Sequence, residues 1–307
     1  MDRETRLRVA LGLNLAIVVA QVVAGFAAHS LGLLADAGHN IADVAAVTLS
    51  IVAVRLARRP PTQERSFGWH RSTILAAQAN AAGLLAATAV IAWEAVHRLM
   101  HPQSIHSGVV VVVAGIAMTV NALAALAVWD RSHDLNMRSA VLHLASDAVG
   151  SAGVCAAGAV MFATGGALWL DPTVSLVIGV IIATQAWRLV RASAEVLLEA
   201  APAGLDVEAL SRAMAAVDGV ESVHDLHVWS LSSEVRALSA HIVVAGHPTL
   251  EEAQLVGAAV KQSISQRFEI AHATLELECE ECVDDTDDAC AMPGVQVPVG
   301  HVHAHNH

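Results

Sequence analysis

Two histidine–aspartate pairs with the same spacing lie inside long apolar segments of the chain. His39 precedes Asp43 by four residues, and His143 precedes Asp147 by the same interval. Residues four apart lie on one face of an α-helix, so each pair is predicted to direct an imidazole and a carboxylate the same way. Two such helices side by side would offer two nitrogens and two oxygens, which is enough to enclose a tetrahedral divalent metal such as zinc.

The apolar surroundings of these pairs give a physical reason for expecting a bound cation. A carboxylate at bilayer depth costs about 2.5–3.5 kcal/mol on insertion scales, so it needs a partner or a function. A cation shared by all four side chains is the simplest partner, whereas the alternative is that each pair forms hydrogen bonds that only join helices. Of the 17 histidines, only His39 and His143 lie deep in an apolar segment, which favours the metal hypothesis. Because metal and proton compete for neutral imidazole, such a site suits metal–proton exchange.

The composition indicates that the helices positioning these pairs cross a membrane. The chain has 307 residues, of which 55% are hydrophobic and 15% charged, and it contains no tyrosine, which is too apolar for an ordinary soluble protein. Windows of about 20 residues reveal low-charge segments long enough to span a bilayer. These six segments comprise residues 7–28, 31–57, 72–97, 107–129, 139–164 and 172–192. The two pairs therefore belong to the second and fifth of six predicted membrane helices.

The placement of arginine predicts the orientation of these helices. Residues 1–199 contain 13 arginines and no lysine, and with both termini in the cytoplasm only Arg98 falls on the outer side. This positive-inside pattern predicts a multi-pass protein of the cytoplasmic membrane, surrounded by lipid, with cytoplasmic termini. The remaining part, residues 200–307, has four basic and 17 acidic residues. Such an acidic surface argues against nucleic acid as a partner.

After residue 199 the pattern changes to that of a small soluble domain. The predicted order is helix, strand, strand, helix, strand, an αββαβ arrangement typical of an α+β domain with a ferredoxin-like or metallochaperone-like fold. The predicted ranges are 206–217, 223–231, 235–245, 249–267 and 272–278. We therefore expect a six-helix membrane domain (1–199), a cytoplasmic α+β domain (200–284) and a disordered His-rich tail (285–307).

The soluble part contains a second group of side chains that could ligate a metal. They are His224, His241, Glu276, Glu278, Cys279 and Cys282. The histidines are predicted on the two strands of a hairpin and the glutamates on one face of the third strand, while the cysteines form a single Cys-x-x-Cys. One such cysteine pair supplies only half a tetrahedral site, so it needs donors from elsewhere. The C-terminal HVHAHNH is either a metal-gathering tract or an incidental end, and the sequence leaves both open.

Several motifs, in order along the chain, resemble those of the cation diffusion facilitators. They are ADAGHNIAD in the second apolar segment, SFGWHRSTIL before the third, HLASD in the fifth and DLHVWSL in the soluble domain. Members of this family are six-helix metal–proton antiporters with a cytoplasmic metal-binding domain, so the resemblance implies a Y-shaped homodimer with alternating access. It also implies that the two His–Asp pairs form the transport site. In having histidine at position 39, the chain resembles the zinc-preferring branch of the family.

The resemblance extends to the loop before the third segment and to the soluble domain. His70 matches the histidine of the family's FGWHR motif, which in relatives can hold a metal near the membrane surface. The alternative is that His70 only packs at that surface. His224, His241 and Glu278 fall at metal-ligand positions of the family's cytoplasmic domain, and Glu276 falls where some relatives have histidine.

Together these features predict proton-coupled efflux of a divalent metal, with Zn²⁺ as the transported substrate and as a regulatory ligand of the soluble domain. The expected partners are the metal ion, protons, membrane lipid and a second copy of the chain. Two alternatives stay open, namely a membrane-bound metal sensor and an intramembrane metalloenzyme. Against an enzyme, four protein ligands leave no open position on the metal, and the chain has no His-Glu-x-x-His motif.

Overall fold

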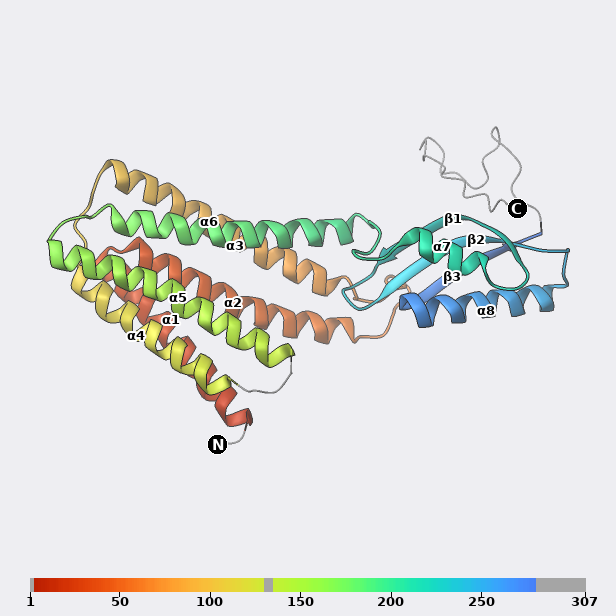
Figure 1. Cartoon of the computed structure of the whole chain (residues 1–307), viewed down its shortest axis with the longest axis horizontal. Coiled ribbons are helices and arrows are strands. Elements are labelled where there is room, and N and C mark those ends of the chain that lie inside the picture. Colours follow the sequence, from red (N-terminus) through yellow and green to blue (C-terminus); the bar gives the residue numbers. More distant parts are fainter. Residues whose placement is uncertain (1–2, 130–134, 280–307) are drawn as a thin grey trace. The chain divides into compact units, whose positions relative to one another are not determined.

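Six long helices form the first part of the chain (Figure 1). The computed structural model describes residues 3–129 and 135–279. The helices are α1 (Arg3–Ala28), α2 (Leu31–Ala57), α3 (Ser72–Met100), α4 (Ser107–Val128), α5 (Leu135–Thr164) and α6 (Leu170–Leu197). Each of α2 to α6 contains a stretch long and apolar enough to cross a membrane, and α1 contributes the shorter apolar stretch Leu15–Ala28. The predicted membrane helical bundle is thus confirmed.

The chain divides into two compact units. The first comprises the described residues up to Val52 together with Ala76–Arg191, and the second comprises Ala53–Leu75 together with the described residues from Ala192 onward. The domain limits expected from the sequence (1–199, 200–284 and 285–307) stay predictions. The His-rich tail lies outside the described residues.

The helices of the first unit place apolar side chains outward and polar ones inward. Phe26, Trp93 and Val149 are each more than two-thirds exposed. The buried polar side chains of this unit include Gln21, Asp36, Asn40, Asn121, Asp147 and Asp171. Such an outward surface suits a lipid environment, whereas the polar groups must find their partners inside the bundle.

The N-terminus of α2 is fixed by side chains from its own segment and from α6. The hydroxyl oxygen of Ser30 accepts a hydrogen bond from the backbone N–H of Leu33 at 3.2 Å. Asp171, in the first turn of α6, accepts from the backbone N–H groups of Leu31 and Gly32 at 2.7 and 3.1 Å. It also accepts from the hydroxyl of Ser30. A helix start leaves such donors without intrahelical partners, so these contacts anchor the helix that contains the first His–Asp pair.

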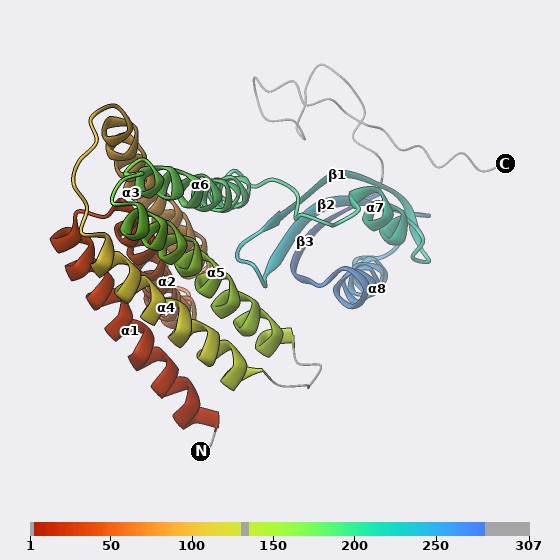
Figure 2. The same cartoon turned by 60° about the vertical axis from the view of Figure 1, so that its left-hand side comes forward.

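The second unit contains a three-stranded sheet with two helices packed on it (Figure 2). Its elements are α7 (Val207–Ala215), β1 (Val220–Ser230), β2 (Arg236–Val244), α8 (Leu250–Phe268) and β3 (Ile270–Glu278). The strand order is β1-β2-β3, with β1 antiparallel to β2 and β3 parallel to β2. The helix α8 makes the crossover that a parallel pair requires. The predicted αββαβ order and small α+β fold are confirmed.

The alternation of side chains along β2 decides which face of the sheet is available for chemistry. The even-numbered residues from Leu238 to Val244 pack in a core with α7 and α8. The residues between them, including His241, point to the opposite, helix-free face. The strand register pairs His241 with His224 on β1 and with Glu276 on β3. The polar residues predicted to bind metal therefore meet on the helix-free face.

Candidate metal centres

The two His–Asp pairs meet in the first unit, where α2 faces α5. The Nε2 atom of His39 lies 3.8 Å from a carboxylate oxygen of Asp43 and 3.6 Å from one of Asp147. The Nε2 atom of His143 lies 3.5 Å from Asp43 and 3.7 Å from Asp147. Each imidazole therefore faces both carboxylates, one on its own helix and one on the other. These four residues are called the quartet below.

The separations between quartet donors suit a small tetrahedral ion. Donor atoms bonded to tetrahedral zinc at 2.0–2.1 Å lie about 3.3–3.4 Å from one another. The four nitrogen-to-oxygen separations of the quartet are 3.5–3.8 Å, so a slight contraction would bring them to that value. Atoms of His39, Asp43 and Asp147 all lie within 4.8 Å of one another. His143 lies outside that group of three, although its Nε2 atom faces both carboxylates at 3.5 and 3.7 Å.

Hydrogen bonding within the pairs does not account for this geometry. N–H···O hydrogen bonds measure about 2.7–3.2 Å, which is shorter than each separation in the quartet. Within the part of the chain that the structure describes, Oδ2 of Asp43 and both carboxylate oxygens of Asp147 are buried without a hydrogen-bond partner. Burying a carboxylate without donors is costly, and a cation or protons would remove that cost.

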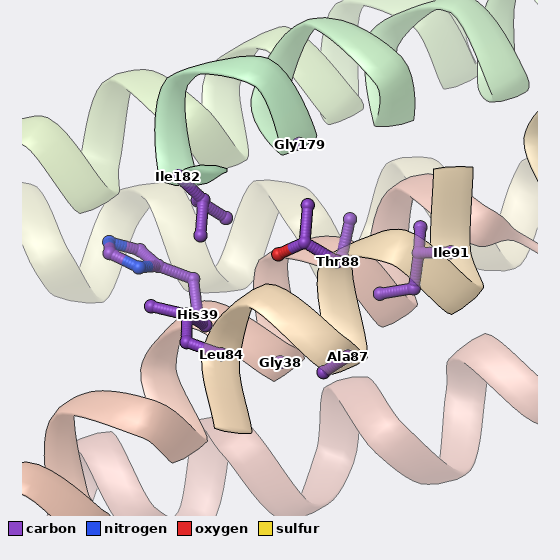
Figure 3. Close-up of a pocket in the computed structure, with 9 residues that line it drawn as sticks. Gly38, His39, Leu84, Ala87, Thr88, Ile91, Gly179 and Ile182 are labelled. Atoms are coloured by element: carbon purple, nitrogen blue, oxygen red, sulfur yellow. The ribbon is translucent and has the colours of Figure 1, made fainter. Parts of the chain in front are cut away.

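A small hollow lies beside His39, between α2, α3 and α6 (Figure 3). Gly38 and Gly179 help to line it, and because they have no side chains they leave its space open. Thr88 is the one polar side chain besides His39 among its lining residues. This nearly apolar hollow offers few groups to a cation, so the donors for a metal are those of the quartet.

A buried hydrogen-bond network that we did not predict from the sequence lies one turn before His39 on α2. Asp36 is 2% exposed and accepts hydrogen bonds from the side-chain amide of Gln21 at 2.5 Å and the hydroxyl of Ser151 at 2.6 Å. The side-chain amide of Asn40 donates to the side-chain oxygen of Gln21 at 3.4 Å. The sequence signal was a third carboxylate inside the same apolar segment, within the ADAGHNIAD motif.

The second cluster of candidate ligands lies on the helix-free face of the sheet. His224 Nε2 is 3.3 Å from one oxygen of Glu278, and His241 Nδ1 is 2.8 Å from the other. Donor atoms of these three residues all lie within 4.8 Å of one another. Glu276 reaches Nε2 of His241 at 3.5 Å, but its side chain is 69% exposed. We therefore place Glu276 at the rim of this cytoplasmic cluster, which consists of His224, His241 and Glu278.

Asp225 also lies beside the cytoplasmic cluster, although we did not predict it. Its carboxylate is 3.6 Å from Nε2 of His241 and 2.9 Å from Nε2 of His227. The strand register shifts between His224 and His227, and Asp225 has φ 46°, so a β-bulge interrupts the alternation of side chains there. An aspartate inside a strand pattern was the available signal, since aspartate is depleted in strands.

The other predicted ligands are not gathered into these clusters. Cys279 is exposed, and neither it nor His70 belongs to the two groups of metal-ligating side chains found in the described residues. The backbone carbonyl of His70 accepts a hydrogen bond from the hydroxyl of Thr73 at 3.1 Å. Cys282 lies outside the described residues. Metal binding by these three residues stays a prediction.

Comparison with protein-family models assigns most of the chain. The cation efflux transmembrane domain matches residues 7–198, and the cation efflux protein cytoplasmic domain matches residues 202–280. The chain belongs to the cation diffusion facilitator family. This membership confirms the resemblance found in the motifs. The protein is thus a multi-pass cation efflux transporter with a cytoplasmic domain, and it is not an enzyme.

Relatives of this cation diffusion facilitator cover nearly its full length. The zinc transporter ZitB of Escherichia coli is 35% identical over 306 residues, which are 98% of this chain and 94% of the relative. The metal cation efflux system protein CzcD of Cupriavidus metallidurans is 35% identical over 282 residues, with 91% and 88% covered. The cadmium, cobalt and zinc/H(+)-K(+) antiporter of Bacillus subtilis is 30% identical over 289 residues, with 93% and 92% covered. Zinc is thus a named substrate of both the Escherichia coli and the Bacillus subtilis relatives.

Proposed function

We propose that this protein exports Zn²⁺ from the cytoplasm across the cell membrane in exchange for protons, by alternating access. The quartet is the transport site. The observation that supports this most strongly is its four nitrogen-to-oxygen separations of 3.5–3.8 Å, at which each imidazole faces both carboxylates. The names of the zinc transporter and antiporter relatives support the same substrate and coupling.

The charges of the quartet give the reason for exchange. Two ionised carboxylates balance the two positive charges of Zn²⁺, so the loaded site is close to neutral. When the metal leaves, two unbalanced anions stay between the helices, and an unpaired anion as buried as Asp147 costs several kcal/mol. Protons relieve that cost, and they also occupy the imidazole nitrogens that metal needs. Metal release and proton uptake are therefore linked at the same atoms.

The proposed orientation has both termini in the cytoplasm and the helices surrounded by membrane lipid. The arginine distribution supports it, because only Arg98 among 13 arginines of the first 199 residues falls on the outer side. Zinc then enters the quartet from the cytoplasm, and protons enter from outside.

The cytoplasmic domain is proposed to bind Zn²⁺ as a regulatory ligand and to form a homodimer. His224, His241 and Glu278 would hold this zinc, since an imidazole and carboxylate donor set suits it. Glu276, at the rim, would complete the ligand set. The match to the family's cytoplasmic domain supports dimer formation.

Three further residues are proposed as metal ligands. Cys279 and Cys282 follow the end of β3 and are proposed as additional zinc donors, as is His70 in the loop before α3.

Transport by purified protein in liposomes tests the proposed function. With an acidic lumen and a zinc-sensitive dye inside, the unmodified protein is expected to bring external Zn²⁺ into the vesicle. Asp43→Asn should abolish this uptake, because it removes one of the two charges that balance the metal. Glu94→Gln is the matched control, since it removes a carboxylate that pairs with Arg98 at 2.8 Å in the same unit. Equal uptake by Asp43→Asn and the unmodified protein would refute the assignment and favour a sensor that does not transport.

A further inference from the structure

The facing side chains of α2 and α5 form three successive contacts, of which the quartet uses two. Asp43 faces His143, and His39 faces Asp147. One turn further, the hydroxyl of Ser151 donates to Asp36 at 2.6 Å. The paired residue numbers rise on one helix as they fall on the other, as expected for antiparallel helices. The Asp36–Ser151 contact therefore continues the same series of side-chain contacts between α2 and α5.

This third contact is buried and belongs to a hydrogen-bond network. Asp36 is 2% exposed, and Ser151, Gln21 and Asn40 are 0% exposed. Gln21 on α1 donates to the same oxygen of Asp36 as Ser151 does. Asn40 donates to the side-chain oxygen of Gln21 at 3.4 Å and to the backbone carbonyl of Asp36 at 3.1 Å. Three helices are therefore joined at one carboxylate, directly beside the quartet.

The partners of Asp36 show what kind of role it has. Its hydrogen-bond donors are an amide and a hydroxyl rather than a cationic side chain. A carboxylate in a membrane span is expensive, and such residues usually serve function. The two His–Asp pairs do not account for the presence of Asp36. Each carboxylate of those pairs already faces two imidazoles, and Asp36 is not among the four residues of the quartet.

The backbone arrangement explains why this contact matters for the metal. The helices α4 and α5 pack closely along their length, whereas α2 and α5 meet through side chains. A methyl group added at Gly150, next to Ser151, would lie 3.5 Å from a carboxylate oxygen of Asp36. Side-chain contacts between α2 and α5 therefore help to set how far apart their ligands stand, and the Asp36–Ser151 bond is the shortest one described between them.

We propose that Asp36 and Ser151 are positioning residues that hold α2 and α5 at the separation needed for an ion as small as Zn²⁺. This inference rests on the proposed transport function of the quartet. Widening the helix pair lengthens the separations between donors on opposite helices, which weakens binding of Zn²⁺ and favours the larger Cd²⁺. The two residues touch no metal themselves and act only through the quartet.

A matched pair of variants tests the proposal, because the chain offers two serine–aspartate contacts of the same kind. Ser151→Ala removes the donor to Asp36, and Ser30→Ala removes the donor to Asp171 at the start of α2. Both serines are 0% exposed and both carboxylates 2% exposed. Initial rates of Zn²⁺ and Cd²⁺ uptake into liposomes are measured against metal concentration, and thermal unfolding of the purified protein reports folding.

Ser151→Ala is expected to raise the KM for Zn²⁺ about tenfold, the lower end of the effect of removing an outer hydrogen-bond partner at a metal site. Its maximal rate should change less, and its Cd²⁺-to-Zn²⁺ ratio of kcat/KM should rise. Ser30→Ala should leave the KM for Zn²⁺ and the metal ratio unchanged, because its contact with Asp171 joins α2 to α6 and not to α5. Asp36→Asn places an amide opposite the hydrogen-bond donors of Asp36. It should shift the Cd²⁺-to-Zn²⁺ ratio in the same direction as Ser151→Ala, whereas Asp171→Asn should not shift it.

Equal KM values and equal metal ratios for Ser151→Ala and Ser30→Ala would overturn the positioning role while leaving the proposed function intact. A purely structural role predicts that each variant loses thermal stability with no change in the metal ratio, which would also overturn it. Failure of the unmodified protein to transport Zn²⁺ would refute the proposed function itself, and the inference with it.

Discussion

His241 and His39 have the same side chain, but their surroundings prepare them for different kinds of metal binding. In the quartet no nitrogen-to-oxygen separation is below 3.5 Å, so a metal finds its donors spaced around it. In the cytoplasmic cluster His241 Nδ1 already lies 2.8 Å from Glu278, within hydrogen-bond distance. A metal must replace that contact, which lowers the net gain on binding. This difference suits a cytoplasmic site that responds to changes in zinc concentration.

At the residue scale, His241→Ala is expected to remove zinc from the cytoplasmic cluster. His241 approaches Glu278, Glu276 and Asp225, so its loss removes the side chain that all three share. Zinc titration of the full chain carrying Asp43→Asn and Asp147→Asn, which disables the quartet, would report the zinc bound outside the quartet. His247→Ala, in the loop after β2, is the control and should bind as the double variant does. Undiminished binding after His241→Ala would show that zinc is held elsewhere.

At the scale of elements, small residues decide how closely the membrane helices approach. A methyl group at Gly158 on α5 would lie 3.0 Å from Val110 and 3.2 Å from Val111 on α4. Nothing lies within 4 Å of the corresponding position at Gly153, also on α5. One helix therefore contains both a tightly packed and an open glycine.

Gly158→Ala is expected to destabilise the protein by about 1–3 kcal/mol, because the added methyl group overpacks the α4–α5 contact. Thermal unfolding of the purified chain in detergent would show a lower midpoint than for the unmodified protein. Gly153→Ala should leave the midpoint unchanged or raise it, since alanine favours the helix and meets no neighbour. A lower midpoint for Gly153→Ala than for Gly158→Ala would contradict this account of the packing.

The start of α8 gives an element that responds to pH. Thr249 and Glu252 form a capping box in which each side chain accepts a hydrogen bond from the backbone N–H of the other residue. The backbone N–H and hydroxyl of Thr249 donate to the carboxylate and hold the pKa of Glu252 below its ordinary value of 4.5. A lowered pKa stabilises the folded helix start above that value, and the gain disappears as pH falls through the folded pKa.

Hydrogen exchange of the full chain is expected to detect this loss. Protection factors of the first amides of α8 should fall as pH drops through the folded pKa of Glu252, which lies below 4.5, because the carboxylate that accepts from Thr249 becomes protonated. In Glu252→Gln the amide keeps a hydrogen-bond acceptor but does not titrate in this range. Its protection should therefore not vary with pH, and an equal pH response in both proteins would exclude the cap as the cause.

The elements themselves could be predicted closely, but two site residues could not. Hydropathy and alternation predicted all six membrane helices and the αββαβ order, because both patterns repeat along the chain. Asp225 escaped prediction because a β-bulge alters the side-chain alternation that the argument used. Asp36 escaped because its partner Ser151 lies 115 residues away, and no local spacing links them. The sequence pattern therefore could not predict contacts between distant segments or local departures from regular geometry.

At the scale of the whole molecule, the membrane makes metal and proton movements depend on each other. The quartet lies in helices whose outer surfaces are apolar, so its charge must be balanced within the bundle. In the proposed exchange, Zn²⁺ balances the two carboxylates in one state, and protons do so in the other. A quartet that returned with neither metal nor protons would leave two unbalanced carboxylates, of which Asp147 is 1% exposed and Asp43 30% exposed. An unpaired anion as buried as Asp147 costs several kcal/mol. Tight exchange follows from this cost.

Zinc-driven proton movement in liposomes tests this central claim most directly. The vesicles contain a pH dye, start with equal pH on both sides and have their membrane potential clamped. Addition of external Zn²⁺ is predicted to make the lumen alkaline as zinc enters, in either orientation of the protein, and Asp147→Asn should abolish both signals. Zinc entry with an unchanged lumen pH, or unchanged signals in Asp147→Asn, would contradict the account.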